Sequence, residues 1–112
     1  MVGQLQQVKV ITSANFEEHL LEILEHGIVM FGMTQARKYF TMIQNVVKKL
    51  DREFTYHPEC RHLATKSRMY RNIILDSHLI IYRITDKRIE VLDILHSASS
   101  IRKIRSVRSI HL

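Results

Sequence analysis

The side chains with the clearest chemical potential in this chain are its cations. Its 112 residues include 17 lysines and arginines against 11 aspartates and glutamates, a formal net charge of +6. Residues 1–56 hold six of each sign, so the whole excess falls in residues 57–112. Such a one-sided excess points to an acidic partner. A nucleic acid and an acidic protein would both satisfy it, and composition does not choose between them.

Metal and redox chemistry find little support in the sequence. No HxxxH or HxxE spacing relates His57, His62, His78 and His111, so we predict no metal site. The lone Cys60 has no second cysteine with which to form a disulfide or a CxxC motif. No motif requires a cofactor, and none is expected.

The elements that must position the cations begin with a short β-branched strand at residues 8–12. Asn15 and Glu18 have the form of a capping box, which places the start of a first helix near the preceding polar residues. Apolar residues at helical spacing carry this helix toward Gly32. The glutamates near its start suit the positive end of the helix dipole and need no functional explanation.

A second helix is the surest element of the chain. Thr34 can cap it, and its apolar residues keep the i, i+3/i+4, i+7 spacing as far as Leu50. Pro58 ends the helical potential that follows. We therefore predict a connecting loop over residues 55–66.

From Arg68 onward the apolar period changes to two, which indicates strands. Turn residues stand at positions 76–77 and 86–87. The predicted element is a three-stranded antiparallel meander, with its strands at 68–75, 78–84 and 88–96.

Turns centred on those dipeptides would also set the register of the meander. Arg83 would then face Glu90 and Ile81 would face Leu92, while Tyr82 would share a face with Arg71, Ile73 and Val91. Arg71 is either a partner of Asp93 on that face or a functional cation. His96, at the end of the last strand, is either a functional group or a donor to a backbone carbonyl.

Length and order of elements predict one α+β domain over residues 1–112, with the helical pair on one face of the sheet. Residues 1–7 would be an N-terminal extension and residues 97–112 a basic tail that is either a final helix or a mobile end. No apolar run approaches the ~18 residues of a membrane helix, and the start lacks the pattern of a secretory signal. We therefore expect a cytoplasmic protein that is not bound to a membrane.

The order of elements and the segment HLIIYRITDKRIEVLDILH, which starts at His78, resemble the RelE/ParE toxins of type II toxin–antitoxin systems. Tyr70 and Arg71 on the preceding strand add to the likeness, which covers residues 8 to about 100. The resemblance implies a small, basic growth inhibitor of the plasmid-stabilisation type. It also implies an acidic antitoxin partner that holds the toxin inactive.

The two branches of this family differ in their targets. RelE-like toxins cut messenger RNA on the ribosome, which needs a base, an acid and cations around the phosphate. The resemblance would give these roles to Arg71, Arg83 and His96, but Leu79 stands where that branch has its central arginine. The ending Ile94-Leu95-His96 instead resembles ParE-like toxins, which inhibit DNA gyrase.

The leading hypothesis is accordingly a toxin that acts by binding DNA gyrase and is neutralised by an antitoxin. ParE-like toxins place basic residues near the chain end, and here these would be Arg102, Lys103 and Arg105, displaced by four small residues after His96. The alternative is a ribosome-dependent endoribonuclease. A general RNA-binding domain is a third reading, although the chain has no RRM-like aromatic run and no GxxG loop.

Overall fold

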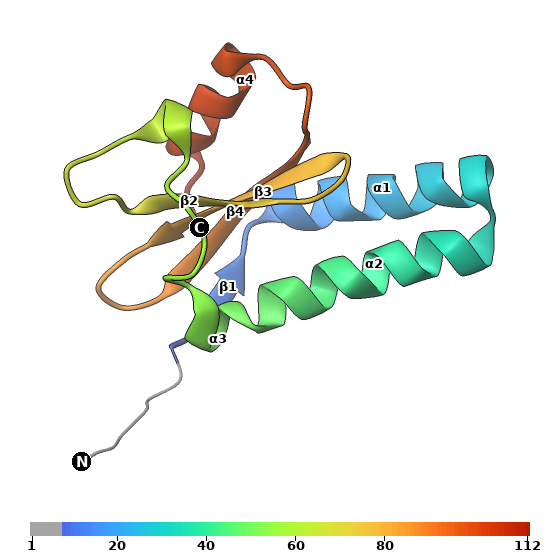
Figure 1. Cartoon of the computed structure of the whole chain (residues 1–112), viewed down its shortest axis with the longest axis horizontal. Helices are drawn as coiled ribbons and strands as arrows, with labels where there is room; N and C mark the ends of the chain where they lie inside the picture. The colour runs from blue at the N-terminus through green and yellow to red at the C-terminus, as the bar shows by residue number, and fades with distance from the viewer. Residues whose placement is uncertain (1–7) are drawn as a thin grey trace.

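A four-stranded sheet is the frame on which the rest of the chain is assembled (Figure 1). The computed structural model describes residues 8–112, and the predicted extension at residues 1–7 lies outside this range. The strands follow the order β1-β4-β3-β2, with β1 parallel to β4 and the other neighbours antiparallel. Their bounds are β1 Val10–Thr12, β2 Tyr70–Ile74, β3 His78–Ile84 and β4 Ile89–His96.

The helical hairpin consists of α1, Ala14–Phe31, and α2, Met33–Lys48, which α3, Leu50–Glu53, follows. Gly32 joins α1 to α2 at a φ of 90°, a conformation that side chains with a Cβ rarely adopt. Gly27 allows the two helices to approach closely, since a Cβ at this position would lie 3.2 Å from Ala36 Cβ. One face of the sheet is covered by the hairpin, as the sequence predicts.

Both predicted helix caps are wrong. Ser13, not Asn15, caps α1: its Oγ accepts from the Phe16 amide at 2.9 Å and donates to the Leu92 carbonyl of β4. The cap thereby also joins the helix to the central strand. Gly32, not Thr34, precedes α2, and among residues 8–112 no side chain forms a capping hydrogen bond with this helix.

The predicted meander is present, and Arg83 pairs with Glu90 as expected. The expected pairing of Ile81 with Leu92 is wrong, because Ile81 pairs with Asp93 across a register shift between Ile81 and Tyr82. Such a bulge leaves one residue unpaired and tightens the local twist. Tyr82 nevertheless lies in the core under the hairpin together with two of its predicted neighbours, Ile73 and Val91.

The C-terminal tail covers the second face of the sheet (Figure 1). It forms α4, Ile101–Ser106, and a 3-10 turn, Val107–Ser109, and it buries Ile104 and Val107. Leu63, from a 3-10 turn at Arg61–Leu63 within the predicted loop, completes this cluster with Ile81 and Leu92. The tail is therefore a docked element, and β4 is buried on both faces.

The same loop covers the free edge of β2. The Cys60 amide donates to the Tyr70 carbonyl at 2.8 Å, and the Asn72 amide donates to the Pro58 carbonyl at 3.0 Å. This edge is consequently unavailable to a further strand along most of its length. Within residues 8–112, no helix has the length and hydrophobicity to cross a membrane.

Candidate functional site

Arg71 is held by the backbone around it. Its guanidinium donates to the carbonyls of Arg68 and His57, each at 2.9 Å. The expected pairing of Arg71 with Asp93 is wrong, because Asp93 is bound by His19 of α1 at 2.5 Å. The side chain of Arg71 thus fixes the loop before β2 to the sheet edge.

Arg83 is the centre of a buried ion-pair network. It contacts Glu90 at 2.7 Å, and the two side chains are only 13% and 9% exposed. Arg83 also donates to Tyr70 and to the carbonyl of Ile110, so it anchors the end of the chain. Burial disfavours ionisation of Glu90, but hydrogen bonds from Arg83 and Arg88 outweigh it and lower the pKa of Glu90.

His96 faces the helical hairpin at the end of β4. It accepts a hydrogen bond at Nδ1 from the Ala98 amide at 3.1 Å, and within residues 8–112 the ring forms no hydrogen bond to a backbone carbonyl. His78 of β3 pairs with His96 of β4, and the centroids of the two imidazole rings lie 5.8 Å apart. The Tyr39 hydroxyl of α2 lies 2.8 Å from His78 Nδ1. Burial and the neighbouring His96 lower the pKa of His78.

The three residues of the nuclease alternative do not meet. Arg71 and His96 lie on the hairpin side of the sheet, whereas Arg83 lies on the tail side. Arg71 pairs with Tyr82, four residues along β3 from His78, which corresponds to about 13 Å. Their side chains cannot surround one phosphate in this arrangement.

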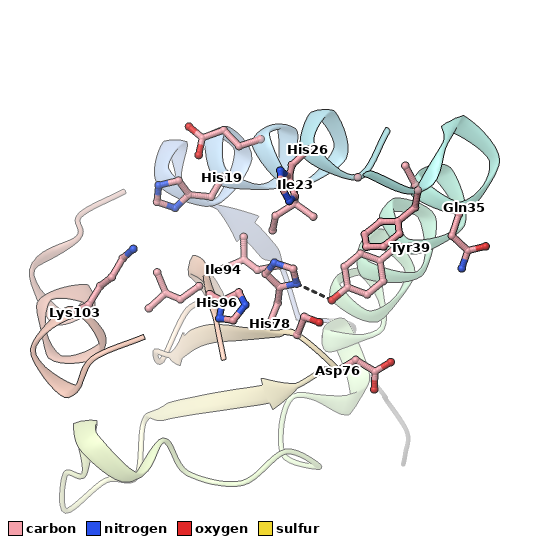
Figure 2. Close-up of a pocket in the computed structure, with 16 residues that line it drawn as sticks. His19, Ile23, His26, Gln35, Tyr39, Asp76, His78, Ile94, His96 and Lys103 are labelled. Atoms are coloured by element: carbon pink, nitrogen blue, oxygen red, sulfur yellow. Dashed lines mark hydrogen bonds between the residues drawn. The ribbon is translucent and has the colours of Figure 1, made fainter. Parts of the chain in front are cut away.

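A pocket of about 500 Å³ opens between the helical hairpin and the ends of β3 and β4, where His78 and His96 lie (Figure 2). Apolar side chains such as Ile23 and Ile94 line its interior. Its titratable lining residues come from α1, α2, the turn before β3, β3, β4 and α4, and they are His19, Glu22, His26, Tyr39, Asp76, His78, His96 and Lys103. No group of three or more histidine, cysteine, aspartate or glutamate side chains converges at metal-binding distance within residues 8–112.

Sequence reasoning missed the contribution of Tyr39 and His78 to this pocket. In the sequence, Tyr39 is one of the apolar residues at helical spacing in the second predicted helix, and His78 is the first residue of the middle predicted strand. The available signal was the strand register, since a meander with the predicted turns brings the first residue of the middle strand opposite His96.

Of the three predicted target-binding cations, only Lys103 lines the pocket. Arg102, Lys103 and Arg105 are exposed on α4, and within the described part of the chain none of them forms an ion pair. Because Ile104 is buried between them, the three bases are presented on a docked helix.

The tip of the hairpin is an apolar surface. The sequence favours Met30, Met33 and Met42 as filler of the core between the helices and the sheet. Met42 does pack against that core, but Met30 and Met33 are 58% and 49% exposed, and Val29 and Phe31 are more so. Phe31 also lines the pocket. Exposed Met and Phe side chains gathered at one place are typical of protein-binding surfaces.

Comparison with known proteins agrees with this fold. A family model described as the ParE toxin of the type II toxin–antitoxin system parDE matches residues 10–101. A solved structure titled a chromosomal ParDE toxin–antitoxin system from P. aeruginosa superimposes with a TM-score of 0.67 and 19% identity. The match covers 81% of this chain and 97% of the other. No curated protein matches.

Proposed function

This chain belongs to the ParE family of toxins of type II toxin–antitoxin systems, and we propose that it arrests growth by binding DNA gyrase. The observation that carries the proposal is that the residues a nuclease would need, Arg71, Arg83 and His96, do not lie together. Arg83 is committed to Glu90 on the tail side of the sheet, while His96 lies on the hairpin side. Leu79, at the position of the missing arginine, packs toward the cluster under the tail. A phosphate would meet no preorganised cation there.

Mapping transcript ends after induction tests the nuclease alternative directly. Since a preorganised cation is typically worth ~100-fold or more in rate, we expect no codon-periodic cuts in translated messages. Such cuts, appearing before growth stops, would support the endoribonuclease and defeat the proposal.

The surface that we assign to the target is the exposed side of α4. Arg102, Lys103 and Arg105 present three cations with no acidic neighbour in the helix, an arrangement that favours an acidic protein surface. Replacing all three with serine should abolish growth arrest and binding to purified gyrase. Their exposure predicts changes in stability within ~0.5 kcal/mol each.

The matched control removes the same charge elsewhere. Arg37, Lys38 and Lys48 are exposed on α2, so their triple serine variant should melt near the parent and still arrest growth. If both triple variants retain full toxicity, the α4 surface is not the target site. Equal loss in both would indicate that net charge alone matters.

An acidic antitoxin is the second partner that we propose. Its binding would use both the basic excess and the apolar hairpin tip. A complex that buries apolar groups should survive about 0.5 M salt, where a purely electrostatic one weakens. Co-expression with a small acidic protein encoded beside this gene should therefore give a pair that co-purifies at that salt concentration. Complete separation would contradict the antitoxin.

A further inference from the structure

Two imidazoles in the pocket are oriented by their neighbours. The Ala98 amide donates to His96 Nδ1, so the proton of neutral His96 resides on Nε2. The Tyr39 hydroxyl lies 2.8 Å from His78 Nδ1, and this hydrogen bond orients the second ring. With its Nδ1 engaged by Tyr39, His78 has Nε2 left to face a ligand, and this nitrogen donates whenever the ring is protonated. The pocket thus holds one N–H donor on His96 and a second on protonated His78.

The charged groups around these imidazoles favour an anion of low charge. The carboxylate of Asp93 on β4 is already engaged, because Oδ1 is hydrogen-bonded to His19 of α1 and accepts from the Ile94 amide. Lys103 reaches the pocket from α4, on the other side of His96 from His78 (Figure 2). Two acidic side chains, Glu22 and Asp76, are exposed at the rim of the pocket, where water screens their charges. The imidazole of His26 is exposed there as well.

The apolar residues that line the rest of the pocket indicate which kind of molecule the anionic group should belong to. Ile23, Ala36 and Ile94 contribute apolar surface, and Phe31 continues it toward the exposed hairpin tip. A volume of about 500 Å³ lies within the range of ligand sites. A carboxylate on an apolar peptide segment would satisfy both the donors and the walls, whereas a phosphate dianion would be repelled more strongly by the acidic rim.

We propose that the pocket binds a carboxylate side chain on an apolar segment of the antitoxin, with His78, His96 and Lys103 as its polar partners. This inference rests on the proposed antitoxin and names the site that receives it. A segment seated there would also cover Lys103, one of the three cations assigned to the target. The antitoxin would then neutralise the toxin by occupying Lys103, a side chain that the target also needs.

The site predicts a pH-dependent complex. A bound carboxylate favours the charged form of both imidazoles, so their pKa values are higher in the complex than in the free toxin. Binding then takes up protons, and affinity rises as pH falls through the bound-state pKa values. We expect about tenfold tighter binding at pH 6 than at pH 8.

The test measures the dissociation constant of the full-length toxin and antitoxin at pH 6, 7 and 8. His78→Gln and His96→Gln each remove one of the two titrating imidazoles, so each should reduce the pH dependence and weaken binding about tenfold at pH 6. His57→Gln is the matched control, because His57 is also part-buried with a lowered pKa but lies against Tyr82, outside the pocket. It should retain the parental pH dependence, and melting curves should show that all variants fold.

A parental affinity that does not change with pH would overturn the inference, as would variants that retain the full dependence. The proposal of an antitoxin is contradicted by a different result, namely that the small acidic protein encoded beside this gene does not bind the toxin at any pH. In that case the carboxylate site is tested on the free toxin, by adding butyrate as a probe and following the histidine resonances by NMR. The resonances of His78 and His96 should shift and their pKa values rise, while His57 is unaffected. Unmoved resonances would overturn the carboxylate site itself.

Discussion

Glu90→Gln should be one of the most damaging isosteric changes in this protein. Glu90 Oε1 accepts from both Arg83 Nε at 2.8 Å and Arg83 Nη2 at 2.7 Å, and Oε2 accepts from Arg88 at 2.8 Å. Glutamine keeps one acceptor but points an NH₂ group at the second arginine. The change leaves the guanidinium of Arg83, 13% exposed, without its counter-charge.

The loss follows from that geometry. Breaking a buried pair costs ~3–5 kcal/mol and a charged hydrogen bond ~1.5–3 kcal/mol, so with one acceptor retained we expect about 2–4 kcal/mol. For a chain of this size the melting temperature should fall by roughly 10 °C or more. Urea unfolding at pH 7 measures the free energy, and Glu25→Gln is the control. Glu25 is exposed and has no ion pair within the described residues, so its change should lie within ~0.5 kcal/mol.

The pH dependence gives a second check. The folded-state pKa of Glu90 is lowered, so its stabilisation is fully present above its unfolded pKa of about 4.3 and is lost as pH falls through the folded value. The difference between parent and Glu90→Gln should therefore be constant above about pH 5 and shrink toward pH 3. A variant that melts within 1–2 °C, roughly the effect of a surface change, would refute this account of the network.

Three further changes test the packing, each by the free energy of unfolding in urea. Ile104→Ala should cost about 2–4 kcal/mol, because it opens a cavity under the tail, whereas Ile101→Ala, at a site 48% exposed, should cost less than ~0.5 kcal/mol. Equal costs would mean that the tail is not docked. Tyr82→Phe removes the 2.6 Å hydrogen bond to the Phe54 carbonyl and should cost ~1–2 kcal/mol. Ser13→Ala removes the cap of α1 and should cost ~1–2 kcal/mol; no loss would mean that the cap is dispensable.

Much of the sheet was predictable because its signals are local. Alternating apolar residues and two-residue turns predict the meander, and the turn at positions 86–87 correctly pairs Arg83 with Glu90. The register beyond Tyr82 was not predictable, since a bulge depends on how the strand must twist against its neighbours. That bulge is why Leu92 does not face Ile81.

The docked tail was hidden for a different reason. Apolar residues at intervals of three, among them Ile104 and Val107, are compatible with both a helix and a mobile end. Only the sheet decides between them, because its second face would otherwise expose Ile81 and Leu92. The three cations proposed for target binding consequently stand on a fixed helix rather than on a loose end.

The candidate pocket lay furthest beyond local reasoning. Tyr39 and His78 are 39 residues apart and come together only when the hairpin packs on the sheet. Each has an ordinary role when considered alone, as an apolar helix position and as a polar strand end. The sequence therefore predicted His96 as a candidate without its two neighbours.

The most direct test of the central claim is a supercoiling assay with purified gyrase, relaxed plasmid and ATP, to which the purified toxin is added. We predict that supercoiling falls as toxin is added, and that the Arg102, Lys103 and Arg105 triple serine variant leaves it unaffected. Undiminished supercoiling at saturating, fully folded toxin would contradict the assignment of gyrase as the target.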